Sequence, residues 1–200
     1  MATDVPLRCR CGKLSGTALE VSPAAGTRIV CYCNDCQAFA HFLERPEITD
    51  DWGGTDIFQM APARVRIDHD DDALRCVRLS AKGLYRWYCR HCKTPVANTV
   101  GARVPFVGLI HSFIDLEHAG KSLDALLGDP IGHVHTRAAL AGGPPHAKQK
   151  SMFPVITRSV RKVFEWWLTG QATPSPFFDA KLRTPRVEPR VLSREERGAL

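Results

Sequence analysis

The sequence lacks any apolar stretch close to the roughly 20 residues that a helix needs to cross a bilayer. Its first residues, MATDVPLRCR, also lack the apolar core of a secretory signal. These absences argue against a membrane-spanning or secreted protein, so we expect a cytoplasmic protein with no membrane partner. With 200 residues, 44% hydrophobic and 24% charged, the composition is that of a folded domain.

Net charge is missing from the first three quarters of the chain. Residues 1–145 hold 16 basic and 16 acidic side chains, whereas residues 146–200 hold 11 basic and 5 acidic ones. The whole formal charge of +6 therefore lies in the last quarter. A basic segment can bind nucleic acid or an acidic partner. Because these charges are scattered, we favour a solvated surface and do not expect a nucleic-acid partner.

Cysteines are plentiful, and seven of the eight fall into three short clusters. The clusters are CRC (Cys9, Cys11), CYCNDC (Cys31, Cys33, Cys36) and CRHC (Cys89, Cys92), and Cys76 stands alone. In a reducing compartment such spacings favour metal binding over disulfides. Alternate residues of a strand face the same side, and a C-x-x-C turn lets two sulfurs reach one ion.

The seven clustered thiols divide naturally into four and three. Four thiolates close a tetrahedral structural zinc site, whereas three leave a position open, as in catalytic zinc sites. The C-x-C and C-x-x-C pairs together supply four ligands, which leaves Cys31, Cys33 and Cys36 as the three. Spacing alone does not decide which clusters join.

The order of these motifs resembles the glutathione-dependent formaldehyde-activating enzyme family, which includes relatives of centromere protein V. The segments CRCGKLSGTALEV, VCYCNDCQAF and WYCRHCKTPVANTV carry the resemblance, which covers about residues 7–115. It implies an Mss4-like (β-tent) zinc-binding fold with two zinc ions per chain. A structural zinc would be held by Cys9, Cys11, Cys89 and Cys92, and a second, open zinc by Cys31, Cys33 and Cys36.

The sequence departs from this family directly after CYCNDC. The family usually has a basic residue there, followed by a turn containing Gly or Ser that lines the substrate site. This chain reads QAFAHFLERPE, with Gln37, Phe39, His41 and Phe42. Bulky aromatic side chains near an open zinc would change what fits there. The resemblance therefore implies the zinc site more strongly than the substrate.

The residue pattern predicts a mainly β domain over residues 1–120. Strand-like segments are GKLSGTALEV, TRIVCYC, RVRID, ALRCVRLS, GLYRWYC, TPVANTV and PFVGLIHSF. The connection HDDDA (69–73) lacks the spacing of a calcium-binding loop, so we interpret its aspartates as a solvated hairpin turn. The segment CQAFAHFLER predicts a short helix that ends before Pro46.

Residues 121–200 read as a C-terminal extension that packs on this domain. A loop is expected near residues 141–146, followed by an amphipathic helix over about residues 154–169 and a Pro-rich basic arm. Such a helix can meet a membrane surface or a partner. We favour a helix whose apolar face packs on the domain, with its basic side in water. Phe177 and Phe178 of the arm are expected to dock on the same chain or on a neighbour, which would make a homodimer.

Two functional hypotheses follow from the open position at the three-cysteine cluster. Zinc with three thiolates binds a further thiol well and holds it as a thiolate. The first hypothesis is therefore a zinc-dependent carbon–sulfur lyase-like enzyme acting on an aldehyde and glutathione or another thiol, as S-hydroxymethylglutathione synthase does. His41 is its nearest candidate for proton transfer. The second hypothesis is a non-catalytic, zinc-stabilised module that binds partners through its basic extension.

The fourth zinc position separates these hypotheses. Water or a thiol there would fit the enzyme, whereas Cys76 or a histidine would close the site and fit the module. We interpret Cys76 as a small buried hydrophobic residue. His91, inside CRHC, is expected to orient its turn, and His133 and His135 are interpreted as loop histidines.

Overall fold

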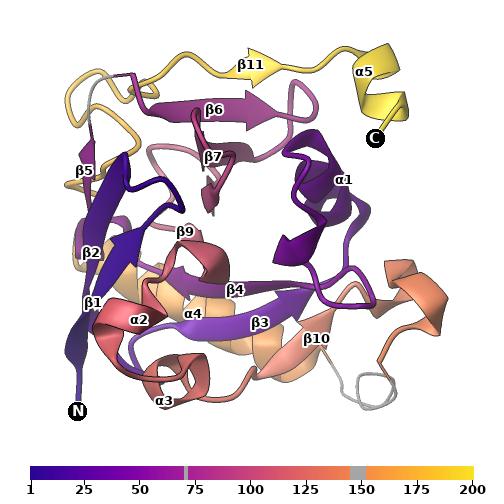
Figure 1. The fold of residues 1–200 in the computed structure, drawn as a ribbon. Coiled ribbons are helices and arrows are strands. Elements are labelled where there is room, and N and C mark those ends of the chain that lie inside the picture. Colours follow the sequence, from indigo (N-terminus) through magenta and orange to yellow (C-terminus); the bar gives the residue numbers. More distant parts are fainter. Residues whose placement is uncertain (70–71, 145–151) are drawn as a thin grey trace.

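The computed structural model describes residues 1–69, 72–144 and 152–200, and it is mainly β, as the sequence predicts. The described strands form a three-stranded sheet, ordered β1-β2-β5, and an eight-stranded sheet, ordered β10-β3-β4-β9-β8-β7-β6-β11 (Figure 1). The strands are β1 (Thr3–Arg8), β2 (Leu14–Val21), β3 (Thr27–Cys31), β4 (Thr55–Met60), β5 (Val65–His69), β6 (Leu74–Arg78), β7 (Tyr85–Cys89), β8 (Pro95–Thr99), β9 (Val107–Ile110), β10 (Gly132–Val134) and β11 (Arg190–Val191). The helices are α1 (Asn34–Phe42), α2 (Leu116–Ala119), α3 (Leu123–Leu127), α4 (Phe153–Leu168) and α5 (Arg194–Gly198).

Each strand-like segment that the sequence predicts coincides with a strand, and the helix after CYCNDC is α1. Two burial patterns account for the agreement: β2 buries Leu14, Ala18 and Val21 on one face, whereas β3, β8 and β9 are short, mostly apolar strands buried along their whole length. The sequence did not predict β1, β4 or the short elements α2, α3, β10, β11 and α5. Part of the predicted turn (residues 70–71) and of the predicted loop (residues 145–146) lies outside the described residues.

Within the smaller sheet, β2 pairs antiparallel with both β1 and β5. The backbone of β5 lies so close to position 16 of β2 that only glycine fits there. A Cβ atom on Gly16 would lie 2.2 Å from the carbonyl oxygen of Arg66, so any other residue would push β5 away. The sheet covers a core that contains Leu7, Leu14 and Trp87.

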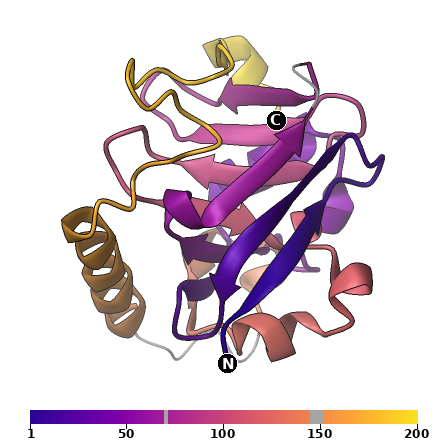
Figure 2. The same ribbon diagram turned by 90° about the vertical axis from the view of Figure 1, so that its left-hand side faces the viewer.

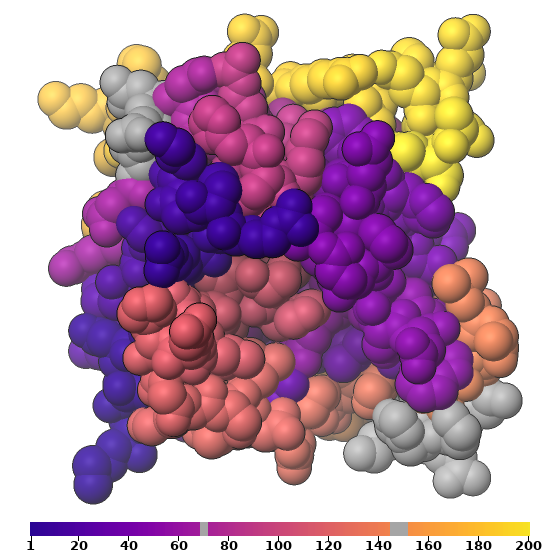
Figure 3. Space-filling model, in the orientation of Figure 1, coloured from indigo at the N-terminus to yellow at the C-terminus, as the bar shows by residue number. Residues whose placement is uncertain are grey.

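Residues 121–200 supply both edges of the larger sheet. β10 pairs parallel with β3, with Val134 opposite Cys31, and β11 pairs parallel with β6. The C-terminal residues run along the β6 edge toward α1 (Figures 1 and 3), where Arg197 lies 2.6 Å from the carboxylate of Asp35. In the described residues no helix has the length and apolar character that crossing a membrane requires.

The phenylalanines of the Pro-rich arm dock on their own chain. Phe177 is fully buried, with its ring centre 5.0 Å from that of Trp87. Phe178 packs edge-on against Tyr85, at 5.3 Å. The arm therefore completes the core instead of reaching for a neighbouring subunit.

Helix α4 packs differently from the prediction. It lies on the outside of the molecule (Figure 2), and its buried side chains are Val155 and Trp166. Arg158 on the same side donates to the carbonyl oxygen of Gly26, at 2.9 Å. Most of the apolar face faces solvent instead of the sheet, because polar contacts of the other side fix the helix. The expectation of an apolar face packed on the domain was wrong.

We predict that Phe177→Ala lowers the free energy of unfolding by about 3–5 kcal/mol, because truncating a buried aromatic ring leaves a cavity. Denaturant-induced unfolding measures the change. Leu182→Ala is the matched control in the same arm, since that side chain is 75% exposed. Its effect should stay within about 0.5 kcal/mol. Similar stabilities of the two variants would show that the arm does not belong to the core.

Candidate metal centres

The first cysteine cluster joins two tight turns that are far apart in the sequence. Cys9 and Cys11 lie in the turn between β1 and β2, where Gly12 adopts a left-handed conformation with φ of 75°. The backbone N–H of Gly12 donates to the carbonyl of Cys9 at 2.9 Å. Cys89 is the last residue of β7 and Cys92 lies in the turn that leads to β8. A 2.9 Å hydrogen bond from the N–H of Cys89 to the carbonyl of Thr94 closes this turn.

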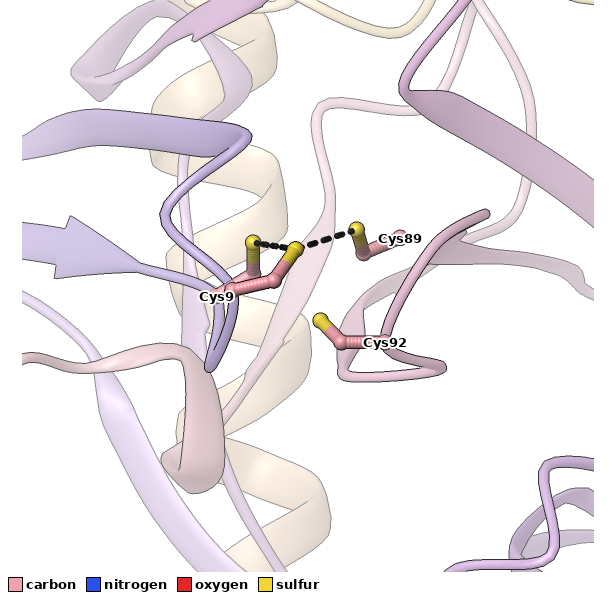
Figure 4. Close-up of side chains that lie close together, drawn as sticks. Cys9, Cys89 and Cys92 are labelled. Carbon is pink, nitrogen blue, oxygen red and sulfur yellow. Dashed lines mark hydrogen bonds between the residues drawn. The ribbon is translucent and has the colours of Figure 1, made fainter.

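The four sulfur atoms of these turns converge on one point. All of them lie within 4.8 Å of one another. The Sγ atoms of Cys9 and Cys11 are 3.5 Å apart, and those of Cys11 and Cys89 are 3.7 Å apart (Figure 4). A tetrahedral ion with metal–sulfur bonds of about 2.3 Å would hold its sulfurs about 3.8 Å apart. The cluster therefore has the ligand type, number and spacing to hold a metal ion.

Thr94 connects the two turns behind the sulfurs. Its buried hydroxyl accepts a hydrogen bond from the backbone N–H of Arg10 at 3.2 Å and lies 3.1 Å from Sγ of Cys92. Burial raises the pKa of Cys92, but hydrogen bonds with the hydroxyl and backbone of Thr94, together with those of Cys11, outweigh burial and lower the pKa to about 6. Thr94 thus favours the thiolate form that binds metal.

The second cluster lies where β3 passes into α1. Cys31 is the last residue of β3, Cys33 caps the N-terminus of α1, and Cys36 lies in its first turn. Their sulfurs also lie within 4.8 Å of one another. Cys31 and Cys36 are buried, whereas Cys33 is half-buried. Over residues 1–69, 72–144 and 152–200, no further His, Cys, Asp or Glu joins this group, so it offers three ligands.

Arg86 supplies positive charge to the second cluster from the middle of β7. Hydrogen bonds from Cys31 and Cys36 hold the pKa of the Cys33 thiol well below its usual value, and the charge of Arg86 acts in the same direction. Arg86 is 2% exposed, lies over the ring of Phe39 and contacts Asn98 at 3.3 Å. Its Nε–H has no hydrogen-bond partner within the described part of the chain.

Within the described residues, none of the other candidate side chains joins either group of sulfurs. Cys76 is buried in the core beside Trp87 and does not join the second cluster. His133 Nδ1 lies 3.1 Å from the hydroxyl of Tyr32, while His91 and His135 are exposed. Positions 36 and 41 are about 140° apart around a helix. The exposed His41 accordingly lines a separate cavity of about 370 Å³, with Gln37 and Glu44.

The aromatic residues after CYCNDC pack toward β7. The rings of Phe39 and Phe42 lie edge-on to Tyr88, at 6.5 and 5.8 Å. Gln37 donates to the carbonyl oxygens of Tyr32 and Ala138, each at 2.8 Å. These side chains therefore position α1, the helix that carries Cys36.

The comparisons with known proteins give a family but no activity. The model of a family of unknown function, DUF6151, matches residues 1–188, so the chain belongs to this family. No curated protein matches the sequence.

We predict that each cluster loses its metal independently when a ligand is removed. Mass spectrometry of metal content should find two ions per chain in the wild type, one for each cluster. Cys33→Ser should lose one ion and stay folded, whereas Cys11→Ser should lose the other and melt at a lower temperature, because its cluster joins two turns. Cys76→Ser is the control and should retain both. A single ion in the wild type would contradict the prediction for the second cluster.

We also predict that Thr94→Val weakens metal binding at the four-cysteine cluster by roughly 10–100-fold, as loss of an outer-shell partner typically does. Competition with a chelator measures the affinity. The loss should grow as the pH falls toward 6, because the variant raises the pKa of Cys92 above its present value of about 6 and protons then compete with the metal. Thr94→Ser keeps the hydroxyl and should bind like the wild type. Equal loss in both variants would mean that the hydroxyl is not responsible.

Proposed function

We propose that this member of the DUF6151 family binds zinc at both cysteine clusters and joins a small thiol, such as glutathione, to an aldehyde at the three-cysteine cluster. The observation that carries the proposal is the second cluster itself. It has three sulfurs within 4.8 Å of one another and no fourth ligand in the described residues. A closed four-cysteine cluster next to an open three-cysteine cluster is the division expected for one structural and one catalytic metal.

Zinc is the metal that we assign to both clusters. Thiolate ligands are soft and suit zinc, copper(I) and iron–sulfur centres, and a tetrahedral set of four sulfurs is typical of zinc or iron. The sulfur spacings of 3.5 and 3.7 Å agree with a mononuclear ion of zinc–sulfur geometry. We further propose that the fold is Mss4-like, as the resemblance to the formaldehyde-activating family implies. Two β-sheets joined through a four-cysteine cluster support this assignment.

The proposed reaction is the reversible addition of a thiol to an aldehyde. A zinc ion held by Cys31, Cys33 and Cys36 would supply Lewis acidity that favours the thiolate form of a substrate thiol. The sulfur electron pair forms a bond to the aldehyde carbon, and the C=O π pair moves onto the carbonyl oxygen. The thiol releases its proton to solvent when it ionises, and solvent returns one proton to that oxygen, which gives the S-hydroxyalkyl adduct. The reverse step releases both substrates. No oxidant or reductant is consumed.

The residues of the chain have separate roles in this proposal. The buried Cys31 and Cys36 form the base of the centre, and the half-buried Cys33 marks the side that substrate approaches. The N-terminus of α1 favours negative charge on Cys33 and Cys36. The positive charge of Arg86 favours the thiolate forms of Cys33 and Cys36. The same guanidinium also lies 3.6 Å from the carboxylate of Asp35. We assign no catalytic role to His41, because it faces a different cavity.

The proposal places the protein in the cytoplasm. All eight cysteines are free thiols, and two clusters of reduced thiols need a reducing compartment. The runner-up, a non-catalytic zinc module, would use the first cluster in the same way but have no reaction at the second.

We predict that zinc-loaded wild-type protein accelerates the exchange between free glutathione, formaldehyde and their adduct, measured by NMR with ¹³C-labelled formaldehyde. Cys33→Ser should lose the acceleration while its far-ultraviolet circular dichroism remains unchanged. Arg86→Gln should slow the exchange, and Arg86→Lys, which keeps the charge, should slow it less. Cys76→Ser is the control and should behave like the wild type.

A cobalt-substituted protein separates binding from catalysis. Addition of glutathione should change the visible absorption of cobalt at the second cluster, and Cys33→Ser should abolish that change. A protein with two metal ions that shows neither the spectral change nor the acceleration is the non-catalytic module. A spectral change without acceleration would retain thiol binding and reject the aldehyde reaction.

A further inference from the structure

Helix α4 is fixed to the body of the protein by one side only. Val155 and Trp166 are buried on that side, and Arg158 donates to the carbonyl of Gly26. The hydroxyl of Ser159 donates to the side-chain oxygen of Gln59 on β4, at 2.7 Å. Because buried, polar and charged contacts all lie on this side, they hold the opposite side of the helix outward.

The outward side is a continuous apolar ridge. It consists of Ile156, Val160, Phe164, Trp167 and Leu168, which are 50–63% exposed. These positions fall on one face of a helix, and the rings of Phe164 and Trp167 stack at 6.2 Å. An apolar patch of this extent on a folded protein indicates an interaction surface.

A groove runs beside the ridge. It has a volume of about 630 Å³ and lies between α4 and the segment 100–106, with Val163, Phe164 and Trp167 on one wall and Val104 and Phe106 on the other. The volume is sufficient for several large side chains. Ridge and groove therefore lie next to each other on one face of the molecule.

We propose that this face is a homodimer interface, in which the α4 ridge of each copy enters the groove of the other. A two-fold interface uses the same patch on both subunits, so the patch must complement itself, and a ridge adjacent to a groove does so. A flat lipid surface could cover the ridge but would leave the groove unfilled. A standard interface buries about 800 Å² on each partner around an apolar centre, and the five ridge side chains, 50–63% exposed, together with the apolar groove walls would form that centre.

Charge on α4 is compatible with self-association. Arg161 and Glu165 are on the polar side of the helix, and Lys162 pairs with Glu165 at 3.2 Å. The charged residues of α4 lie on its other sides, and none belongs to the row of exposed apolar side chains that runs from Ile156 to Leu168. Two copies that each carry a net charge of +6 still repel at long range. Added salt should therefore leave the dimer intact or strengthen it, because salt screens repulsion but not apolar contact.

Sedimentation velocity over a series of protein concentrations tests the proposal on the full chain. We expect the wild type to shift from monomer to dimer as the concentration rises. Val160→Glu and Phe164→Glu should each raise the dissociation constant at least about tenfold, as loss of a central apolar anchor typically does. Leu116→Glu is the matched control, because it places the same charge on an exposed leucine of α2, away from α4 (Figure 2), and should dimerise like the wild type.

Circular dichroism and melting temperature establish that each variant is folded. A wild type that stays monomeric at all concentrations overturns the proposal. Vesicles of mixed phosphatidylcholine and phosphatidylglycerol provide a second arm. Monomers that bind these vesicles through the ridge, with loss of binding in Phe164→Glu, would assign the face to a lipid surface instead. A dimer that both ridge variants leave intact would place the interface elsewhere and overturn the proposal too.

Discussion

The convergence of four cysteine sulfurs is the contact on which the arrangement of the two sheets depends. Cys9 and Cys11 come from the edge of the smaller sheet, and Cys89 and Cys92 from the end of a strand in the larger one. Cys9, Cys89 and Cys92 also pack in the main core beside Trp87. A metal ion at this point would therefore cross-link the sheets where hydrophobic burial already brings them together, and its binding energy would add to folding.

The position of the second cluster follows from the same contact. β7 ends at Cys89 of the first cluster and carries Arg86 to the thiols of the second. Helix α1 connects the clusters from the other side. Its first turn holds Cys36, and just beyond its last turn Arg45 donates to the carbonyl of Cys92 at 2.7 Å. One strand and one helix therefore connect the two clusters, although each cluster holds its ligands separately.

The C-terminal residues complete this framework and carry the basic charge. β10 pairs with the strand that ends at Cys31, and Phe177 fills the core next to Trp87. Arg197 of α5 pairs with Asp35 in the first turn of α1, beside the second cluster. The segment therefore braces the three-cysteine cluster from two directions. The ridge on α4 is the part of it that faces outward.

The sequence by itself determined seven of the nine strands β1–β9, all except β1 and β4, and the grouping of seven cysteines into three short motifs, because strand-like residue patterns and C-x-C or C-x-x-C spacing are local properties of the chain. Tertiary structure decided which turns meet, since Cys11 and Cys89 are 78 positions apart. It also brought Arg86 to the thiols and stabilised β10 and β11, which are too short to form without the strands they join.

For α4 the helical spacing of apolar residues in the sequence revealed an apolar face, but contacts of Arg158 and Ser159 with other elements decided that this face points to solvent. Local patterns specify what a segment can bury, whereas what it does bury depends on partners that only the folded chain supplies.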